Sequence, residues 1–236
     1  MLDNTPLRYW VIIPAAGKGT RMQAELPKQY LQLLGRTVLE HTLSCFAHHP
    51  KIAGVMVALA PDDILWPTLR VESATIRTTL GGLERCHSVL NALIALAPDA
   101  AEHDWVLVHD AARPCLRRTD IDRMIETLHG GRDGGILATP VRDTLKRCSA
   151  EGAIEQTIDR TGLWHALTPQ MFRYASLRGA LETAVAGGLQ VTDEAQAIEF
   201  TGAALRVVAG HADNIKITRP EDLVLAELYL RAQGRA

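Results

Sequence analysis

The sequence predicts an α/β protein whose central sheet is mostly parallel and is covered by helices on both faces. Four short runs are apolar at nearly every position, as expected of strands that are buried on both faces. Longer segments with apolar residues at helical spacing alternate with these runs, and such alternation produces right-handed crossovers in a parallel sheet. The chain has 236 residues, of which 47% are hydrophobic and 22% charged, so it can build its own core and does not have the composition of a disordered protein.

The predicted strands and helices follow one another in a regular order. The strands lie at residues 9–13, 54–59, 105–108 and 135–138, and the helices at residues 37–49, 84–97, 119–129 and from 220 to the glycine at 234. Thr37 and Glu40 have the spacing of a capping box, which marks the start of the first helix. Pro220 suits the first turn of the last helix, where the acidic residues that follow it match the positive end of the dipole.

The stretch 141–160 breaks this alternation, because charged residues there are interleaved with threonine, valine and isoleucine around Gly152. This pattern predicts an exposed two-stranded arm, bounded by residues 141–162, on a single domain that spans residues 1–236. Isolated hairpins are marginally stable in water, so we expect the arm to pack on a second copy of the chain in a homodimer. A solvated hairpin without a partner is the alternative.

Charge and cysteine content limit the partners and the compartment. The formal net charge is −2, which gives no overall field for nucleic acid or an anionic membrane, so any anion site must be local. The four cysteines are far apart in the sequence and are expected to be reduced thiols packed in the interior. We expect a cytoplasmic protein, because the sequence lacks a signal-peptide pattern and any run of 18 apolar residues.

The loop after the first strand is rich in small residues, and a second motif follows it. The two motifs read Pro-Ala-Ala-Gly-Lys-Gly-Thr-Arg-Met at 14–22 and Pro-Lys-Gln-Tyr at 27–30. Small residues let backbone N–H groups approach phosphate oxygens, and Arg21 and Lys28 would then surround one polyphosphate. The alternative is that Gly17 and Gly19 make a tight turn and both cations are solvated. The loop is neither a Walker A motif nor a dinucleotide fingerprint, since Met22 replaces the third glycine, and this argues against a nicotinamide-dependent oxidoreductase.

These motifs resemble the signature of the 2-C-methyl-D-erythritol 4-phosphate cytidylyltransferases, and the resemblance extends from about residue 10 to 230. Further motifs of that family follow in order: Gly-Gly-x-x-Arg-x-x-Ser at 81–88, His-Asp-Ala-Ala-Arg-Pro at 109–114, Arg-Asp-Thr at 142–144, Asp-Arg at 159–160, Thr-Pro-Gln at 168–170, Thr-Asp-Glu at 192–194 and Asp-Asn-Ile-Lys at 213–216. The resemblance implies a Rossmann-like, GT-A-like nucleotidyltransferase sheet with a dimerising arm. It also implies transfer of CMP from CTP to methylerythritol phosphate, with release of diphosphate, in non-mevalonate isoprenoid synthesis.

The same resemblance assigns roles to individual residues. The implied catalytic residues are Arg21, Lys28, Arg160 and Lys216; the nucleotide-binding residues are Ala15, Ala16, Gly17, Gly19, Gly82, Arg85 and Ser88; the acceptor-binding residues are Arg113, Thr144 and Thr192. Arg21 and Lys28 would stabilise the transition state, while Arg160 and Lys216 would hold the acceptor phosphate. Because Arg160 lies at the end of the arm, it would enter the neighbouring subunit's site together with Thr144. Arg113 could instead anchor its loop by an ion pair.

Asp110 follows the strand at 105–108, which places a carboxylate at the edge of the sheet where Mg²⁺ could bridge nucleotide phosphates. Capping of the next turn is the alternative role. Asp213 is a weaker second candidate for the metal, equally compatible with a turn. Leu83 stands where relatives often carry aspartate, which leaves the details of cytosine recognition open.

The implied nucleophile is a phosphate oxygen that is already anionic, so the reaction needs no general base and depends instead on preorganised positive charge. The residues also allow two other interpretations. The acceptor could be another polyol phosphate, such as ribitol 5-phosphate, or the chain could be a non-catalytic nucleotide-binding protein of the same fold.

Overall fold

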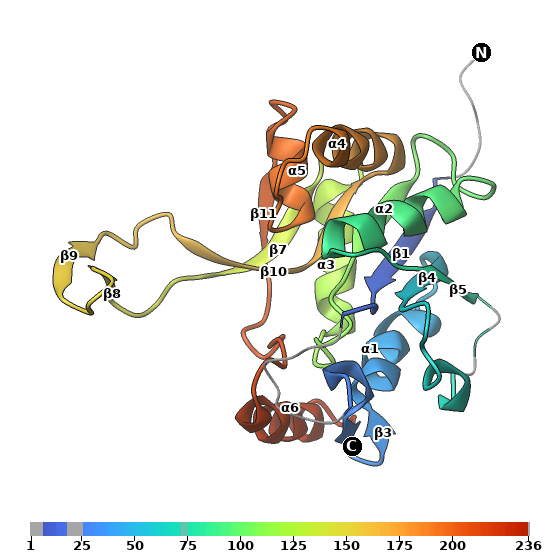
Figure 1. The fold of residues 1–236 in the computed structure, drawn as a ribbon, viewed down its shortest axis with the longest axis horizontal. Helices are drawn as coiled ribbons and strands as arrows, with labels where there is room; N and C mark the ends of the chain where they lie inside the picture. Colours follow the sequence, from blue (N-terminus) through green and yellow to red (C-terminus); the bar gives the residue numbers. More distant parts are fainter. Residues whose placement is uncertain (1–6, 18–25, 72, 74, 236) are drawn as a thin grey trace.

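The computed structural model describes residues 7–17, 26–71, 73 and 75–235. Its centre is a seven-stranded sheet in the order β11-β7-β10-β6-β1-β4-β5 (Figure 1). The strands are β1 (Tyr9–Pro14), β4 (Ile52–Leu59), β5 (Ile76–Leu80), β6 (Trp105–Val108), β7 (Gly135–Pro140), β10 (Trp164–Arg173) and β11 (Arg206–Ala209). Only β10 runs against its neighbours, β6 and β7, and every other pair is parallel. The predicted mostly parallel sheet is therefore confirmed.

Helices cover both faces of this sheet. They are α1 (Val38–Ala47), α2 (Arg85–Leu96), α3 (Arg118–Leu128), α4 (Tyr174–Ala186), α5 (Glu194–Glu199) and α6 (Pro220–Ala232), with short 3₁₀ helices η2 (Lys28–Tyr30) and η3 (Trp66–Thr68). Successive side chains of β1 point to opposite faces. Val11 and Ile13 pack in one core with residues of α1 and α3, whereas Trp10 and Ile12 pack in another with residues of α2, α4 and α5.

The start of α1 shows how the sequence fixes one element locally. Thr37 Oγ1 accepts a hydrogen bond from the backbone N–H of Glu40 at 3.2 Å, and Glu40 Oε2 accepts from the backbone N–H of Thr37 at 2.6 Å. This confirms the predicted capping box. The helix also lies beside a small two-stranded sheet, β2 (Gln32–Leu33) and β3 (Arg36–Thr37), which forms a third core with α6.

The predicted arm is present as an antiparallel pair, β8 (Leu145–Cys148) and β9 (Ile154–Ile158), which forms a sheet of its own. It extends away from the central sheet between β7 and β10 (Figure 1). Cys148 lies exposed on β8, so the prediction that all four cysteines are packing thiols was wrong for this one. An arm of two strands has no second layer that could bury it. All four cysteines are free.

No helix among the described residues combines the length and the apolar character needed to cross a bilayer.

Candidate active site

A cavity of about 190 Å³ opens where β1 and β6 end. Parallel strands bring their following loops to one edge of the sheet, and ligands of such folds bind there. The lining residues are Pro14, Ala15, Ala16, Gly17, Lys28, Gln29, Gly82, Leu83, Glu84, Arg85, Ser88, Asp110, Ala111, Ala112 and Lys216. Nine residues assigned from the sequence therefore meet in one place: Ala15, Ala16, Gly17, Lys28, Gly82, Arg85, Ser88, Asp110 and Lys216.

The small-residue loop forms one wall of this cavity and is held from behind. The buried side chain of Gln29 donates its Nε2 to the carbonyl oxygens of Ala15 at 2.8 Å and Gly17 at 3.2 Å. A Cβ built on Gly17 would meet no described atom within 4 Å. Such a wall lets phosphate oxygens approach the chain closely. Gly19 and Arg21 lie outside the described residues.

Two lysines from distant parts of the chain converge on the cavity. Lys28 Nζ donates to the carbonyl oxygen of Ile217 at 3.0 Å, although the two residues are 189 positions apart. The neighbouring residue, Lys216, places its Nζ 3.0 Å from Asp110 Oδ2. The two ammonium groups thus lie at one site although their segments are far apart in the sequence, as the resemblance implied.

Asp110 is the electrostatic centre of the cavity wall. Arg85 Nε lies 3.2 Å from its Oδ1, and Arg113 Nε and Lys216 Nζ lie 3.1 and 3.0 Å from its Oδ2. Burial alone would raise the pKa of this carboxyl, but the charges of Arg85, Lys216 and Arg113 outweigh burial and hold the pKa far below its usual range. Asp110 is therefore an ionised carboxylate surrounded by cations.

Glu194, the first residue of α5, completes this network and was not singled out from the sequence. Its Oε1 accepts from Arg85 Nη1 at 2.5 Å, and its side chain is 1% exposed. Arg85 thus bridges two carboxylates, Asp110 and Glu194. The partners are 109 positions apart, so no local spacing signals the pair. The only sequence signal was membership of the Thr-Asp-Glu motif.

The structure favours the alternative role for Arg113. Its buried guanidinium is committed to Asp110 and to the carbonyl oxygen of Asn214, which accepts from Nη1 at 2.8 Å. These contacts anchor the loop, as the alternative expected, and acceptor binding by Arg113 stays a prediction. Asp213 does not reach the cavity either. It pairs with Arg117, whose Nε lies 2.8 Å from Oδ2, and its metal role stays a prediction.

Three of the predicted catalytic and acceptor residues lie outside the cavity of their own chain. Thr144 and Arg160 belong to the exposed arm, where Arg160 Nη1 donates to the carbonyl oxygen of Arg142 at 2.5 Å. Thr192 precedes α5, and its backbone N–H donates to Gln196 Oε1 at 2.7 Å. A single chain does not bring these three residues to the nucleotide wall.

The loop before α2 forms the opposite wall. Ser88 Oγ accepts from the backbone N–H of Gly82 at 3.0 Å and donates to the carbonyl oxygen of Glu84 at 3.2 Å. A Cβ on Gly81 would lie 2.5 Å from the Cβ of Ala16, so glycine is required for the two walls to approach. Leu83 is fully exposed at the rim of the cavity.

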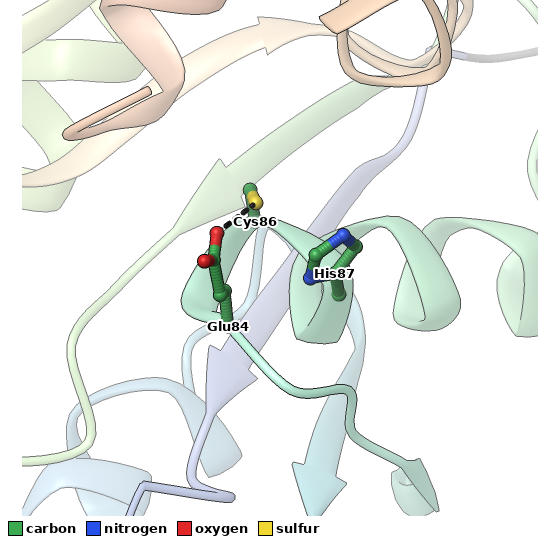
Figure 2. Close-up of side chains that lie close together, drawn as sticks. All are labelled: Glu84, Cys86 and His87. Atoms are coloured by element: carbon green, nitrogen blue, oxygen red, sulfur yellow. Dashed lines mark hydrogen bonds between the residues drawn. The ribbon is translucent and has the colours of Figure 1, made fainter. Parts of the chain in front are cut away.

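Glu84, Cys86 and His87 lie together at the start of α2, with their potential ligand atoms within 4.8 Å of one another (Figure 2). The Cys86 thiol donates to Glu84 Oε2 at 3.7 Å. A mixed oxygen, sulfur and nitrogen set suits Zn²⁺ rather than Mg²⁺, which prefers oxygen alone. Asp110, not this group, therefore has the chemistry for Mg²⁺.

The fold and the cavity define an α/β enzyme of the nucleotidyltransferase class, with cations gathered around a small-residue loop at the edge of a parallel sheet. The family model for 2-C-methyl-D-erythritol 4-phosphate cytidylyltransferase matches residues 9–232. The chain belongs to this family.

Individual relatives agree with the family match. The 2-C-methyl-D-erythritol 4-phosphate cytidylyltransferase of Pseudomonas putida (strain W619) is 56% identical over 225 residues, covering 94% of this chain and 95% of that protein. That of Ectopseudomonas mendocina (strain ymp) is 55% identical over 218 residues, covering 92% and 93%. The crystal structure of the Francisella tularensis enzyme has a TM-score of 0.82 at 36% identity and covers 94% of this chain and 100% of that one. A crystal structure of 4-diphosphocytidyl-2C-methyl-D-erythritol synthase reaches 0.84 at 37%, covering 95% and 100%.

Proposed function

We propose that this chain transfers CMP from CTP to 2-C-methyl-D-erythritol 4-phosphate, giving 4-diphosphocytidyl-2-C-methyl-D-erythritol and diphosphate in non-mevalonate isoprenoid synthesis. The observation that carries the proposal is the convergence of Lys28 and Lys216 on a cavity walled by backbone of small residues. An acceptor phosphate oxygen forms a bond to the α-phosphorus of CTP. The bond from that phosphorus to the bridging oxygen breaks, and diphosphate leaves.

The described cavity supplies positive charge rather than a base. Its lining residues include no histidine. The nearby His109 is fully buried, bonded to Thr168 Oγ1 and to the carbonyl oxygen of Arg113, and burial lowers its pKa to about 4. The anionic nucleophile has no proton to lose, so Lys28 and Lys216 would act by stabilising charge that gathers on the phosphate oxygens.

Mg²⁺ is the proposed cofactor, and Asp110 is the described residue that fits it. The carboxylate is ionised, lies at the carboxyl edge of β6 and faces the cavity, and Mg²⁺ on a nucleotide needs few protein ligands. Arg85 already contacts its Oδ1, and Arg113 and Lys216 contact its Oδ2, so the ion would replace one of these contacts. Lys216 is about a third exposed, and its ammonium can turn to a phosphate. When bound, the ion would neutralise charge on the nucleotide phosphates.

We also propose a homodimer in which the arm of one subunit completes the site of the other. Thr144 and Arg160 are exposed on the arm and do not reach the cavity of their own chain, which supports this arrangement. The four free cysteines suit a reducing compartment, and the expected location stays cytoplasmic.

A panel of acceptors tests the proposed function. Purified protein is incubated with CTP, Mg²⁺ and either methylerythritol phosphate or ribitol 5-phosphate, and released diphosphate is measured. We expect release with methylerythritol phosphate. Turnover of ribitol 5-phosphate alone would contradict the acceptor, and CTP binding without diphosphate from either acceptor would contradict the reaction.

A further inference from the structure

Glu194 is a buried carboxylate to which the proposed reaction gives no role. Its side chain is 1% exposed, and its one described hydrogen-bond donor is Arg85. The second oxygen, Oε2, is buried without a hydrogen-bond partner among the described residues. Burial raises the pKa of the Glu194 carboxyl above its usual value, and the Arg85 guanidinium opposes that shift. An ionised carboxylate in such a place is costly unless it is paired, and Arg85 is the described cation that pairs with it.

The backbone that carries Glu194 is held rigidly against the sheet. Gln170, which is almost fully buried on β10, donates its Nε2 to Asp193 Oδ2 at 2.8 Å, and its Oε1 accepts from the backbone N–H of Ala195 at 2.9 Å. These bonds fix the residues on both sides of Glu194. The backbone position of Glu194 is therefore set by its contacts with the sheet, and the longer side chain of Arg85 extends to the carboxylate.

We propose that Glu194 is a positioning residue that holds the Arg85 guanidinium at the nucleotide wall; the inference rests on the proposed function. Glu194 balances one of the three cations that surround Asp110, and it holds the Nη1 end of the Arg85 guanidinium while Nε stays 3.2 Å from Asp110 Oδ1. It also ties the segment that follows Thr192 to the nucleotide cavity. CTP binding should therefore depend on Glu194 through Arg85.

The test is a double-mutant cycle with E194Q and R85Q. The Kd of CTP is measured by calorimetry without acceptor, and kcat and KM are measured by diphosphate release. Glutamine keeps the shape of Glu194 and removes its charge. We expect E194Q to weaken CTP binding about tenfold, and R85Q/E194Q to be no weaker than R85Q within about twofold. Glu199, exposed at the end of the same helix, provides the matched control E199Q, which should behave as wild type.

Two results would overturn the inference. One is a CTP affinity in E194Q equal to that of the wild type. The other is a loss of CTP affinity in R85Q/E194Q equal to the sum of the losses in the two single variants, since additivity would mean that Glu194 acts by holding α5. If E194Q does not fold, R85K serves instead, because one ammonium cannot span both carboxylates; normal CTP affinity in R85K would also overturn the inference. The calorimetric measurement of CTP binding needs no acceptor. It therefore decides the role of Glu194 even if the wild-type protein binds CTP and releases no diphosphate, a result that would refute the proposed function alone.

Discussion

Removing the charge of Asp110 should destabilise the protein as well as disable it. In D110N the three cations lose the carboxylate that lies within 3.0 to 3.2 Å of each. Removing one partner of a buried ion pair costs about 3–5 kcal/mol. The asparagine oxygen can still accept from one cation, so we expect the lower end, about 3 kcal/mol. For a chain of this size that corresponds to a fall in Tm of roughly 6–12 °C.

Calorimetric melting of wild type and D110N at several pH values measures this effect. The folded pKa of Asp110 is depressed, so its contribution is complete above its unfolded pKa of about 4 and is lost as the pH falls further. The gap between the melting temperatures of the two proteins should therefore begin to narrow as the pH falls below about 4 and should continue to narrow at lower pH. The control is D99N, which breaks the half-exposed Asp99–Arg77 pair and should cost less than about 1 kcal/mol. A D110N protein that melts with wild type at pH 7 would refute the electrostatic account.

Three further predictions concern the acceptor, the shared site and the fold. K216Q should lower kcat/KM for the acceptor about 100-fold while the Kd of CTP changes little; a loss confined to CTP binding would contradict the assigned role. Inactive K28A and R160A proteins, mixed and allowed to exchange subunits, should recover about a quarter of wild-type diphosphate release, because half of the dimers gain one intact site. No recovery despite proven exchange would argue against a shared site. T37A should lose about 1 kcal/mol in urea unfolding and T37S much less, whereas equal losses would exclude the capping contribution.

Strands buried on both faces could be predicted from the sequence, and strands at the edges could not. Residues of β6, such as Trp105 and Val108, are apolar throughout because helices cover both sides. β5 and β11 lie at the two edges of the sheet and are largely exposed; the centre of β5 is polar, and the apolar run of β11 is only three residues long. β10 was also not predicted from the sequence, and its pairing with β7 is irregular between Ala166 and Gln170.

The residues of the candidate site also divide into those that could be placed from the sequence and those that could not. Motifs anchored to one strand end, such as the loop at Ala15 or the carboxylate of Asp110, could be placed from the sequence because the end of a strand fixes their position. The bridge from Arg85 to Glu194 could not, because the contact depends on how α2 and α5 pack. Arg113 lies near the same strand end, but its partner depends on the side-chain direction, which the sequence does not fix.

The single antiparallel strand has a mechanical consequence. β10 starts at the base of the arm, where Trp164 pairs with Pro140, and runs on to Gln170, which pairs with Val108 two residues before Asp110. The arm is thus joined to the cavity wall by the strand β10, whose pairing with β7 is irregular between Ala166 and Gln170. A strand can slide only in whole-residue steps, each of which turns its side chains to the opposite face. We expect a change in the position of the arm to alter the cavity wall through β10, in addition to moving the acceptor-binding residues that the arm is proposed to carry.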